Sequence, residues 1–299
     1  MFTISLSDKS IRFLETNKDK KICFAHQITD NFELENIITQ NKLTDSYIDR
    51  ASDEINKILK NSGTSAHTAK LVLETSQCFA NVIPLDFSEN KEKISSNILW
   101  ELSNYFPEDY KHYKINYHKL LTESLTDSIK ETLIIAVKSS KLDAIKKLSN
   151  RIDIKISSID IEHFAAERYF RAIRKELITE ENIVVIGCKK NRIDYSIINS
   201  KGCYAYSFIT IEDDSNFQDK LIKAFIKFEE KYKDLDINNI YLYGDETTSA
   251  VYKIINDTSV NGRVILSNPF YEIGITDKVN TDIVSEGYKF TPLCGILIG

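Results

Sequence analysis

An internal repeat constrains the fold of this 299-residue chain more than any other feature of its sequence. Residues 2–28 and 183–209 each contain an apolar strand, a short polar turn, an alternating strand, a second polar turn and a third strand. The first turns fall at Asp8-Lys9 and at 189–191, where the residue types favour a tight reversal of the chain. The repeat therefore predicts two three-stranded meanders, one in each half of the chain.

The segments that follow the two meanders also match each other. In the first half, apolar residues recur at helical spacing over 48–59, and a strand is predicted at 69–74. In the second half, a helix predicted over 217–228 is followed by a strand at 239–244. Each half therefore has the order β-β-β-α-β, and the long distance between the two copies is typical of a duplicated domain rather than of a solenoid.

The halves then diverge, which predicts an insertion in the first one. In the second half a helix at 247–255 leads to a strand at 263–267, and we expect the equivalent helix of the first half at 161–175. The intervening residues have a pattern of their own, with strands at 79–85, 113–117, 132–138 and 154–158 and helices at 94–105 and 142–149. We therefore expect three units: 1–76 together with 159–181, an inserted subdomain 77–158, and 182–299.

This organisation predicts an α/β fold of two layered halves. Two halves of the order β-β-β-α-β-α imply two mixed sheets that face each other across a cleft, with a small α+β subdomain inserted in the first half. Halves of this kind are ribonuclease-H-like, and the paired arrangement is that of the actin-like fold.

Charge and cysteine content exclude several classes of function. The chain has 39 Lys and Arg against 44 Asp and Glu, so it lacks the basic excess of nucleic-acid-binding proteins, and we expect no nucleic-acid partner. Its five cysteines form no C-x-x-C pair and have no His at zinc-ligand spacing, which indicates a reducing cytoplasm and no metal site. The N-terminus lacks a signal peptide, and no apolar stretch approaches the roughly 20 residues of a membrane-spanning helix. We therefore expect a cytoplasmic protein without direct membrane insertion.

Four segments carry a resemblance to a known family. They are 98–116 (ILWELSNYFPEDYKHYKIN), 133–163 (LIIAVKSSKLDAIKKLSNRIDIKISSIDIEH), Asn268-Pro269-Phe270 and the small-residue segment 294–299. In this order and spacing the chain resembles the PilM family of actin-like type IV pilus assembly proteins, and more distantly the cell-division protein FtsA. The resemblance extends along nearly the whole chain and implies the actin-like fold.

The resemblance also shows where a nucleotide site would lie. Actin-like ATPases hold Mg-nucleotide between two hairpin turns, each with an Asp-x-Gly motif, and a Gly-rich adenosine loop. The matching positions here are Ser5-Leu6-Ser7, Val185-Ile186-Gly187 and Gly244-Asp245-Glu246. Both motif carboxylates are replaced, and Asp245 and Glu246 bring negative charge to where phosphates would lie. We therefore expect a pseudo-ATPase with no catalytic residue, no bound cofactor and no metal.

Two alternatives remain open. The chain could still be a divergent ATP-binding assembly ATPase, in which ATP and Mg²⁺ would be held by Ser7, Lys9, Ser10, Gly187, Lys189 and Gly244, with the lysines, including Lys190, in place of backbone donors. The three lysines are equally well interpreted as hydrated surface residues at turns, with no role in binding phosphate. The second alternative is an interaction domain unrelated to pili. Asp160 and Glu162 are interpreted as charges at the start of a helix, and His163 as a packed side chain.

The inserted segment is rich in aromatic residues and contains the sole Trp of the chain. In the PilM family the corresponding subdomain takes part in recognising a cytoplasmic peptide of a membrane-anchored partner. The resemblance thus implies a non-catalytic scaffold of a pilus or secretion machine, recruited to the inner face of the membrane by such a peptide or domain. Because Tyr and Trp are enriched in binding hot spots, the candidate contacts are Trp100, Tyr105, Tyr110 and Tyr113. Exposed strand edges would also allow self-association, for which the sequence has no independent signal.

Overall fold

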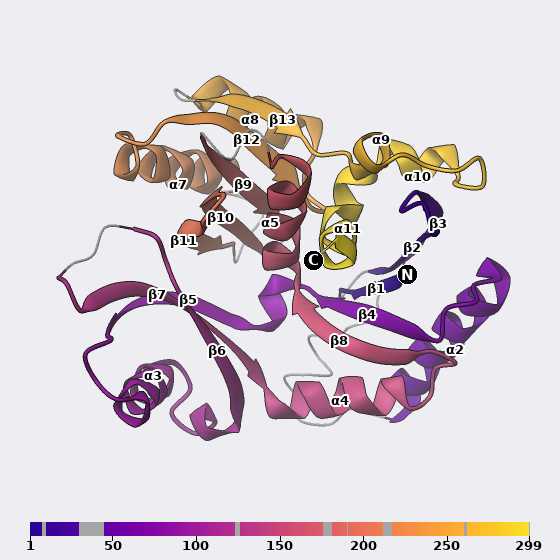
Figure 1. The fold of residues 1–299 in the computed structure, drawn as a ribbon, viewed down its shortest axis with the longest axis horizontal. Helices are drawn as coiled ribbons and strands as arrows, with labels where there is room; N and C mark the ends of the chain where they lie inside the picture. Colours follow the sequence, from indigo (N-terminus) through magenta and orange to yellow (C-terminus); the bar gives the residue numbers. More distant parts are fainter. Residues whose placement is uncertain are drawn as a thin grey trace.

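Two five-stranded mixed sheets with the same strand order form the body of the molecule (Figure 1). The computed structural model describes residues 1–7, 10–29, 45–122, 126–175, 181–189, 191–211, 217–259 and 262–298. The first sheet has the order β3-β2-β1-β4-β8, with β1 Phe2–Leu6, β2 Ser10–Thr16, β3 Ile22–Thr29, β4 Thr68–Leu73 and β8 Lys155–Ile161. The second has the order β11-β10-β9-β12-β13, with β9 Asn182–Cys188, β10 Arg192–Asn199, β11 Gly202–Thr210, β12 Ile237–Tyr243 and β13 Arg263–Leu266. The predicted repeat is therefore a repeat of one sheet topology.

The central strands of the two sheets pair in the same way. β1 runs antiparallel to β2 and parallel to β4, and β9 runs antiparallel to β10 and parallel to β12. Every residue of β1 is buried: Phe2 and Ile4 belong to the core of the first half, while Thr3 and Ser5 point to the opposite face. Both faces of this strand are therefore covered, as is usual for strands with parallel neighbours. The equivalent pairing places the first hairpin turn of each sheet at an equivalent position.

Helices cover the outer faces of both sheets. α2 (Asp45–Ser62) and α4 (Ser139–Ser149) pack in the hydrophobic core of the first sheet. α7 (Phe217–Lys231) and α8 (Ser249–Thr258) pack in that of the second. The remaining short helices are the 3₁₀ turns η1 Thr75–Gln77, η2 Tyr110–His112 and η4 Gly287–Phe290, and α9 Pro269–Ile273 and α10 Thr281–Ser285.

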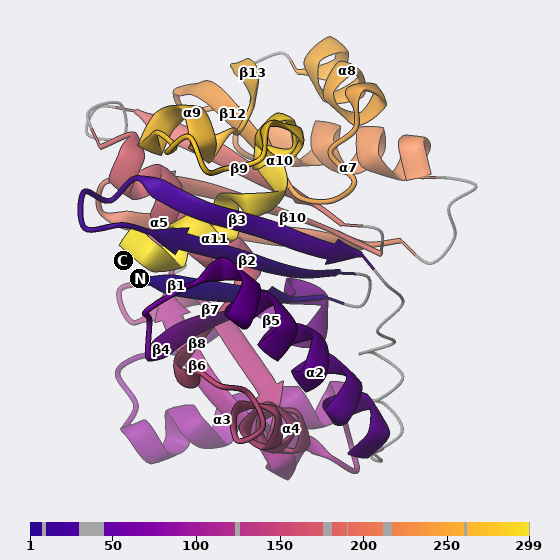
Figure 2. The same cartoon turned by 90° about the vertical axis from the view of Figure 1, so that its right-hand side faces the viewer.

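Two helices, α5 (Glu162–Ile173) and α11 (Thr291–Ile298), cross between the sheets (Figure 2). A Cβ atom built on Gly295 of α11 would lie only 1.7 Å from the carbonyl oxygen of Ala165 on α5, so the two backbones are in direct contact. The core around this crossing includes Leu14 of the first sheet and Val185 of the second. The crossing therefore joins the two halves through one shared core.

The described residues of the inserted subdomain form a three-stranded antiparallel sheet and one α-helix. Its strand order is β5-β7-β6, with β5 Phe79–Asp86, β6 Tyr113–Lys119 and β7 Ile129–Lys138, and its helix is α3 (Lys91–Tyr105). Ile94 and Ile98 of α3 pack against Ile83 and Ile134 of the sheet in a separate small core. Asn90 caps the helix, because its side chain accepts a hydrogen bond from the backbone N–H of Lys93 at 2.9 Å.

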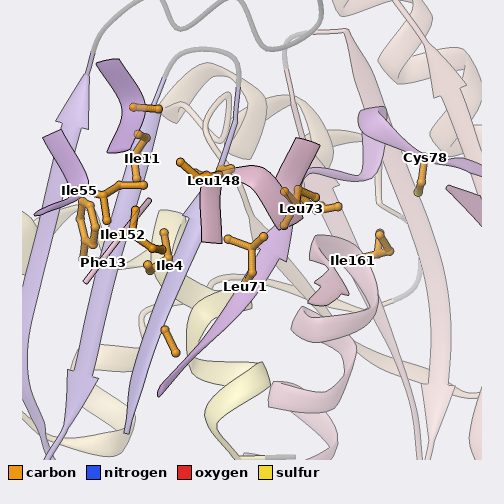
Figure 3. Packing of buried hydrophobic residues seen from close by; sticks show 14 of the residues in the cluster. Ile4, Ile11, Phe13, Ile55, Leu71, Leu73, Cys78, Leu148, Ile152 and Ile161 are labelled. Carbon is orange, nitrogen blue, oxygen red and sulfur yellow. The ribbon is translucent and has the colours of Figure 1, made fainter. Parts of the chain in front are cut away.

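The helix predicted at 142–149 and the strand predicted at 154–158 do not belong to this subdomain, so their assignment to the insertion is wrong. The strand is β8, which pairs in parallel with β4 at the edge of the first sheet. The helix is α4, whose Leu148 packs with Ile4 and Phe13 in the core of the first half (Figure 3). α4 and β8 thus correspond to α8 and β13, and α5 corresponds to α11 rather than to the helix at 247–255. Alternating apolar residues indicate that a strand is buried, but they do not indicate which sheet it joins.

Candidate functional site

Ser7 and Ser10, on either side of the first hairpin turn between β1 and β2, hydrogen-bond to each other. The backbone N–H of Ser7 donates to the carbonyl oxygen of Ser10 at 3.0 Å, and the two hydroxyls lie 2.9 Å apart. The backbone N–H of Ser10 donates back to the Ser7 hydroxyl at 3.1 Å. Asp8 and Lys9 lie outside the described residues. Ser7 and Ser10, named as nucleotide ligands under the ATPase alternative, are therefore both hydrogen-bonded within the turn.

The glycine of the second hairpin is covered by a tyrosine of the same chain. A Cβ atom on Gly187 would lie 2.5 Å from the hydroxyl oxygen of Tyr243 on β12, the strand that runs parallel to β9. The small residue at this position thus makes room for an aromatic side chain, whereas in the resembling ATPases the matching glycine lies close to phosphates. Lys190, in the same turn, lies outside the described residues.

Lys189 follows β9 and is buried between two carboxylates. Its Nζ atom lies 2.5 Å from Oε1 of Glu162, at the start of α5, and 3.3 Å from Oδ2 of Asp245, just after β12. The side chains of Lys189 and Glu162 are each only 3% exposed. The interpretation of Lys189 as a hydrated surface lysine is therefore wrong. Its ammonium group is buried and forms ion pairs with two carboxylates.

Arg12 of β2 completes this cluster from the first sheet. Its Nη2 atom forms an ion pair with Oδ1 of Asp245, and its Nε donates to Oε1 of Gln27 at 2.7 Å. Asp245 thus bridges a cation of the first half and a cation of the second. We call Arg12, Glu162, Lys189 and Asp245 the cleft cluster. Arg12 was not among the predicted site residues, although a cation between Ile11 and Phe13 in a buried strand indicates a buried partner.

The pKa values in the cleft cluster reflect burial and mutual attraction. Burial opposes the charge of Lys189, but Asp245, Glu162 and Glu74 outweigh it and raise the pKa of the ammonium group. Burial likewise disfavours charge on Asp245, yet Lys189 and Arg12 hold the pKa of that carboxyl below its usual range. Burial raises the pKa of Glu162 to about 7, against the attraction of Lys189. The charged forms of Lys189 and Asp245 thus stabilise each other, whereas the pKa of Glu162 lies near neutral pH.

Gly244, the remaining glycine of the adenosine-loop position, has a backbone role. Its φ of 106° lies in the region that L-residues rarely adopt, and a Cβ atom there would lie 2.5 Å from the carbonyl oxygen of Cys188. Its N–H donates to the carbonyl oxygen of Tyr288 at 3.2 Å. Gly244 therefore lets the chain after β12 turn closely past the end of β9, which positions Asp245 beside Lys189.

A buried polar network lies next to the cleft cluster. His163, on α5, is fully buried, with Nδ1 2.9 Å from the hydroxyl of Tyr243 and Nε2 3.0 Å from that of Ser196. Burial lowers the pKa of His163 to about 4, so the ring is neutral near pH 7. His163 is thus a packed, hydrogen-bonded side chain, as the sequence analysis interpreted it. Glu162 does start a helix, but its buried pairing with Lys189 goes beyond a helix-start charge.

The four aromatic candidates of the insertion differ in exposure. Trp100 and Tyr105, on α3, are 67% and 51% exposed, whereas Tyr110 and Tyr113 are half-buried. Tyr105 accepts a hydrogen bond from the side chain of Asn81 at 3.0 Å, and Tyr113 stacks on Phe106 at a ring-centroid distance of 4.9 Å. Trp100 and Tyr105 are therefore the two candidates with most of their surface available to a partner.

A groove that the sequence analysis did not predict separates the insertion from the first half. It has a volume of about 590 Å³, and its lining includes Lys114 and Asn116 of β6, Ile135 of β7, Ile159 of β8 and Phe164 of α5. We call it the β6–β8 groove. β6 and β8 are both the last strand of their sheets in the described part of the chain. None of the four candidate aromatics lines this groove.

Among the described residues, no group of three or more His, Cys, Asp and Glu side chains could hold a metal ion. No helix among the same residues is long and apolar enough to cross a membrane.

Comparison with known proteins identifies the family. A family model described as type IV pilus assembly protein PilM matches residues 3–204. The chain belongs to the PilM family. This confirms the resemblance seen in the sequence. No curated protein sequence matches the chain.

Solved structures confirm the actin-like fold of this PilM-family chain. A PilM-PilN type IV pilus biogenesis complex matches with a TM-score of 0.72 and 11% identity, over 98% of this chain and 96% of that one. The ethanolamine utilization protein EutJ from Carboxydothermus hydrogenoformans matches with a TM-score of 0.52 and 10% identity, over 100% and 89%. A Bacteroides thetaiotaomicron protein with actin-like ATPase fold matches with a TM-score of 0.50 and 8% identity, over 88% and 90%. At these identities the likenesses establish the fold alone.

Proposed function

We propose that this chain is a non-catalytic scaffold of the PilM family that works without nucleotide and binds a protein partner. The cleft cluster is the observation that carries the proposal. Arg12 of β2 and Lys189 just after β9 each form an ion pair with Asp245. Mg-nucleotide does not fit these residues, because its phosphates would have to displace Asp245 from both cations. A phosphate would thus compete with a carboxylate of the chain itself, which already forms ion pairs with both cations.

The covered glycine supports the same proposal. Phosphate-binding turns need glycine so that backbone N–H groups can close on the phosphate oxygens. At Gly187 the space above the backbone is filled by the ring and hydroxyl of Tyr243, which is itself hydrogen-bonded to the buried His163. Admitting a phosphate would require this ring to leave a fully buried site.

The partner is proposed to bind as an extended segment in the β6–β8 groove. Alternate residues of β7, including Leu133 and Ile135, form an apolar wall, and exposed Lys114 supplies positive charge. Arg168, by contrast, is ion-paired with Asp160 of the same groove. The two edge strands that flank the groove offer unpaired backbone groups, which extended peptides commonly use. Apolar anchors between two strand edges suit a peptide better than a small cofactor.

The partner's identity rests on the family. The similar solved structure is a complex of PilM with PilN. By analogy we propose that the occupant of the groove is a cytoplasmic peptide of a membrane-anchored, PilN-like protein, which would recruit this chain to the inner face of the membrane.

Two matched isoleucines test the groove. Ile159 lines it and Ile226, on α7, does not, and both side chains are 39% exposed. We expect Ile159→Glu to weaken capture of the cytoplasmic segment of the PilN homologue from the same organism about tenfold or more, because a carboxylate in the apolar groove loses its hydration. Ile226→Glu should bind like the wild type in the same fluorescence anisotropy titration.

The exposed aromatic residues of α3 are the alternative docking site, and Trp100→Ala tests it. If Ile159→Glu binds normally while Trp100→Ala loses the segment, the docking site is the α3 surface and the groove assignment is wrong. If neither substitution changes binding, both surfaces are excluded as the site for this segment.

A further inference from the structure

A second groove lies between the edge strand β11 and helix α7. It has a volume of about 790 Å³ and is lined by 206–210 of β11, by one face of α7 and by Asn81 and Val82 of β5. We call it the α7–β11 groove. It shares no lining residue with the β6–β8 groove, so it is a separate surface of the molecule.

One wall of this groove is a row of lysines. Lys220, Lys223, Lys227 and Lys231 line it at the spacing i, i+3, i+7 and i+11, which places them on one face of α7. Lys223, Lys227 and Lys231 are exposed, and Lys220 is half-buried. Among the described residues that line the groove, Glu131 is the single carboxylate, and it acts electrostatically on Lys231. Among the described lining residues, the other three lysines give this wall a net positive charge.

The opposite wall is a strand edge with unpaired backbone groups. The N–H of Ile211 donates inward to the carbonyl oxygen of Asn191, so alternate residues back along β11 also point toward β10. The residues between them therefore point outward. At the start of β11, where its register with β10 shifts, the carbonyl oxygens of Cys203 and Tyr204 instead accept from the N–H groups of Leu121 and Thr122 at 3.0 and 3.2 Å. The backbone N–H and C=O groups of Tyr206, Phe208 and Thr210 point away from β10. In the described chain no further strand lies beside β11 on this side.

We propose that the α7–β11 groove binds an extended acidic segment of a partner protein. The segment adds as a strand to the edge of β11, and its acidic side chains meet Lys220, Lys223 and Lys227. Outward N–H groups need an acceptor and outward C=O groups need a donor, so the edge requires a ligand that offers both. A polyphosphate or a nucleic-acid backbone offers acceptors alone at its phosphates, which leaves the carbonyl oxygens of the edge unpaired. An acidic peptide satisfies the edge and the lysines together.

Two charge-matched peptides test strand addition with the full-length chain. The probe is a labelled seven-residue peptide of alternating Glu and Val, and its control replaces each Val with Pro, which keeps the charge and removes N–H donors. In fluorescence anisotropy titrations we expect the Glu-Val peptide to bind about tenfold or more tightly than the Glu-Pro peptide. Equal affinity for the Glu-Pro peptide, or displacement of the probe by inorganic polyphosphate at equal charge, would overturn the proposal.

Substitutions separate the lysine row from the strand edge. We expect Lys227→Glu to weaken binding of the Glu-Val probe about tenfold, and Lys253→Glu, at an exposed lysine of α8 outside the groove, to leave it unchanged. Thr210→Pro removes one outward N–H without breaking a ladder bond to β10, so it should weaken binding, whereas Thr210→Ala should not.

Unchanged probe affinity in Lys227→Glu, or in a Thr210→Pro variant that melts like the wild type, contradicts the proposal. Sedimentation of the chain without peptide measures its oligomeric state and completes the test. A dimer that Lys227→Glu dissociates would show that the occupant is a second copy of this chain, and the proposal of an acidic partner segment would then be wrong.

Discussion

Asp245 lies between two buried cations from different halves of the molecule, Arg12 of β2 and Lys189 after β9. From the sequence alone this aspartate was expected to repel phosphates. In the structure its carboxylate forms ion pairs with both cations. Gly187 was likewise interpreted from the sequence as a residue of a phosphate turn. In the structure its lack of a side chain makes room for Tyr243.

Gly187→Ala tests whether that glycine serves packing within this chain. Its new Cβ atom would lie 2.5 Å from the hydroxyl oxygen of Tyr243 and 2.7 Å from the ring carbon that carries it. We expect the substitution to lower the free energy of unfolding by about 1–3 kcal/mol in urea denaturation without any nucleotide present. If the glycine were retained only for a phosphate, the nucleotide-free protein would keep its stability.

His163 predicts a pH dependence of stability. Its pKa is about 4 when folded against 6.5 for a free histidine, so between these values the unfolded chain binds more protons than the native one. Its contribution is therefore full above pH 6.5 and falls as the pH drops toward 4, by up to about 3 kcal/mol.

The measurement compares the wild type with His163→Gln by urea unfolding at pH 7 and pH 4.5. We expect the variant to be less stable at pH 7, because contacts to Tyr243 and Ser196 are weakened. We also expect it to lose less stability than the wild type on acidification. Parallel losses in the two proteins would contradict a buried neutral imidazole.

At the scale of elements, sequence periodicity predicted where strands and helices lie in the chain better than it predicted which strands pair and which helices pack together. The two meanders and the helix that follows each were predictable, because alternation and helical spacing are local properties of the chain. The partnership of β8 with β4 was not, because the insertion separates the two strands in sequence by more than 80 residues. The crossing of α5 and α11 was also not predictable, because the two helices are distant in sequence. A small residue within the apolar segment 291–298 does indicate close helix packing.

Gly295→Ala tests that crossing. Because the added Cβ atom would lie 1.7 Å from the carbonyl oxygen of Ala165, the two helices must move apart and disturb the core that both sheets share. We expect a loss of about 3 kcal/mol or more in unfolding free energy. Ile298→Ala in the same helix, at a side chain that is 41% exposed, should change stability by less than about 1 kcal/mol. Equal effects of the two substitutions would rule out a tight crossing.

At the scale of the whole molecule, the two halves are joined by the α5–α11 core and by the cleft cluster, while strand edges face the surface at β6, β8 and β11. This arrangement suits a scaffold that presents edges to extended partners. The actin-like fold was predictable, since it follows from the repeat. The cleft cluster was not, because Arg12, Glu162 and Asp245 are distant in sequence and only the folded chain brings them together.

Isothermal titration of the purified chain with Mg-ATP tests the central claim most directly. Because Arg12 and Lys189 are already paired with Asp245, we predict no binding with a Kd tighter than about 1 mM. Saturable binding with a Kd in the micromolar range would contradict a nucleotide-free scaffold.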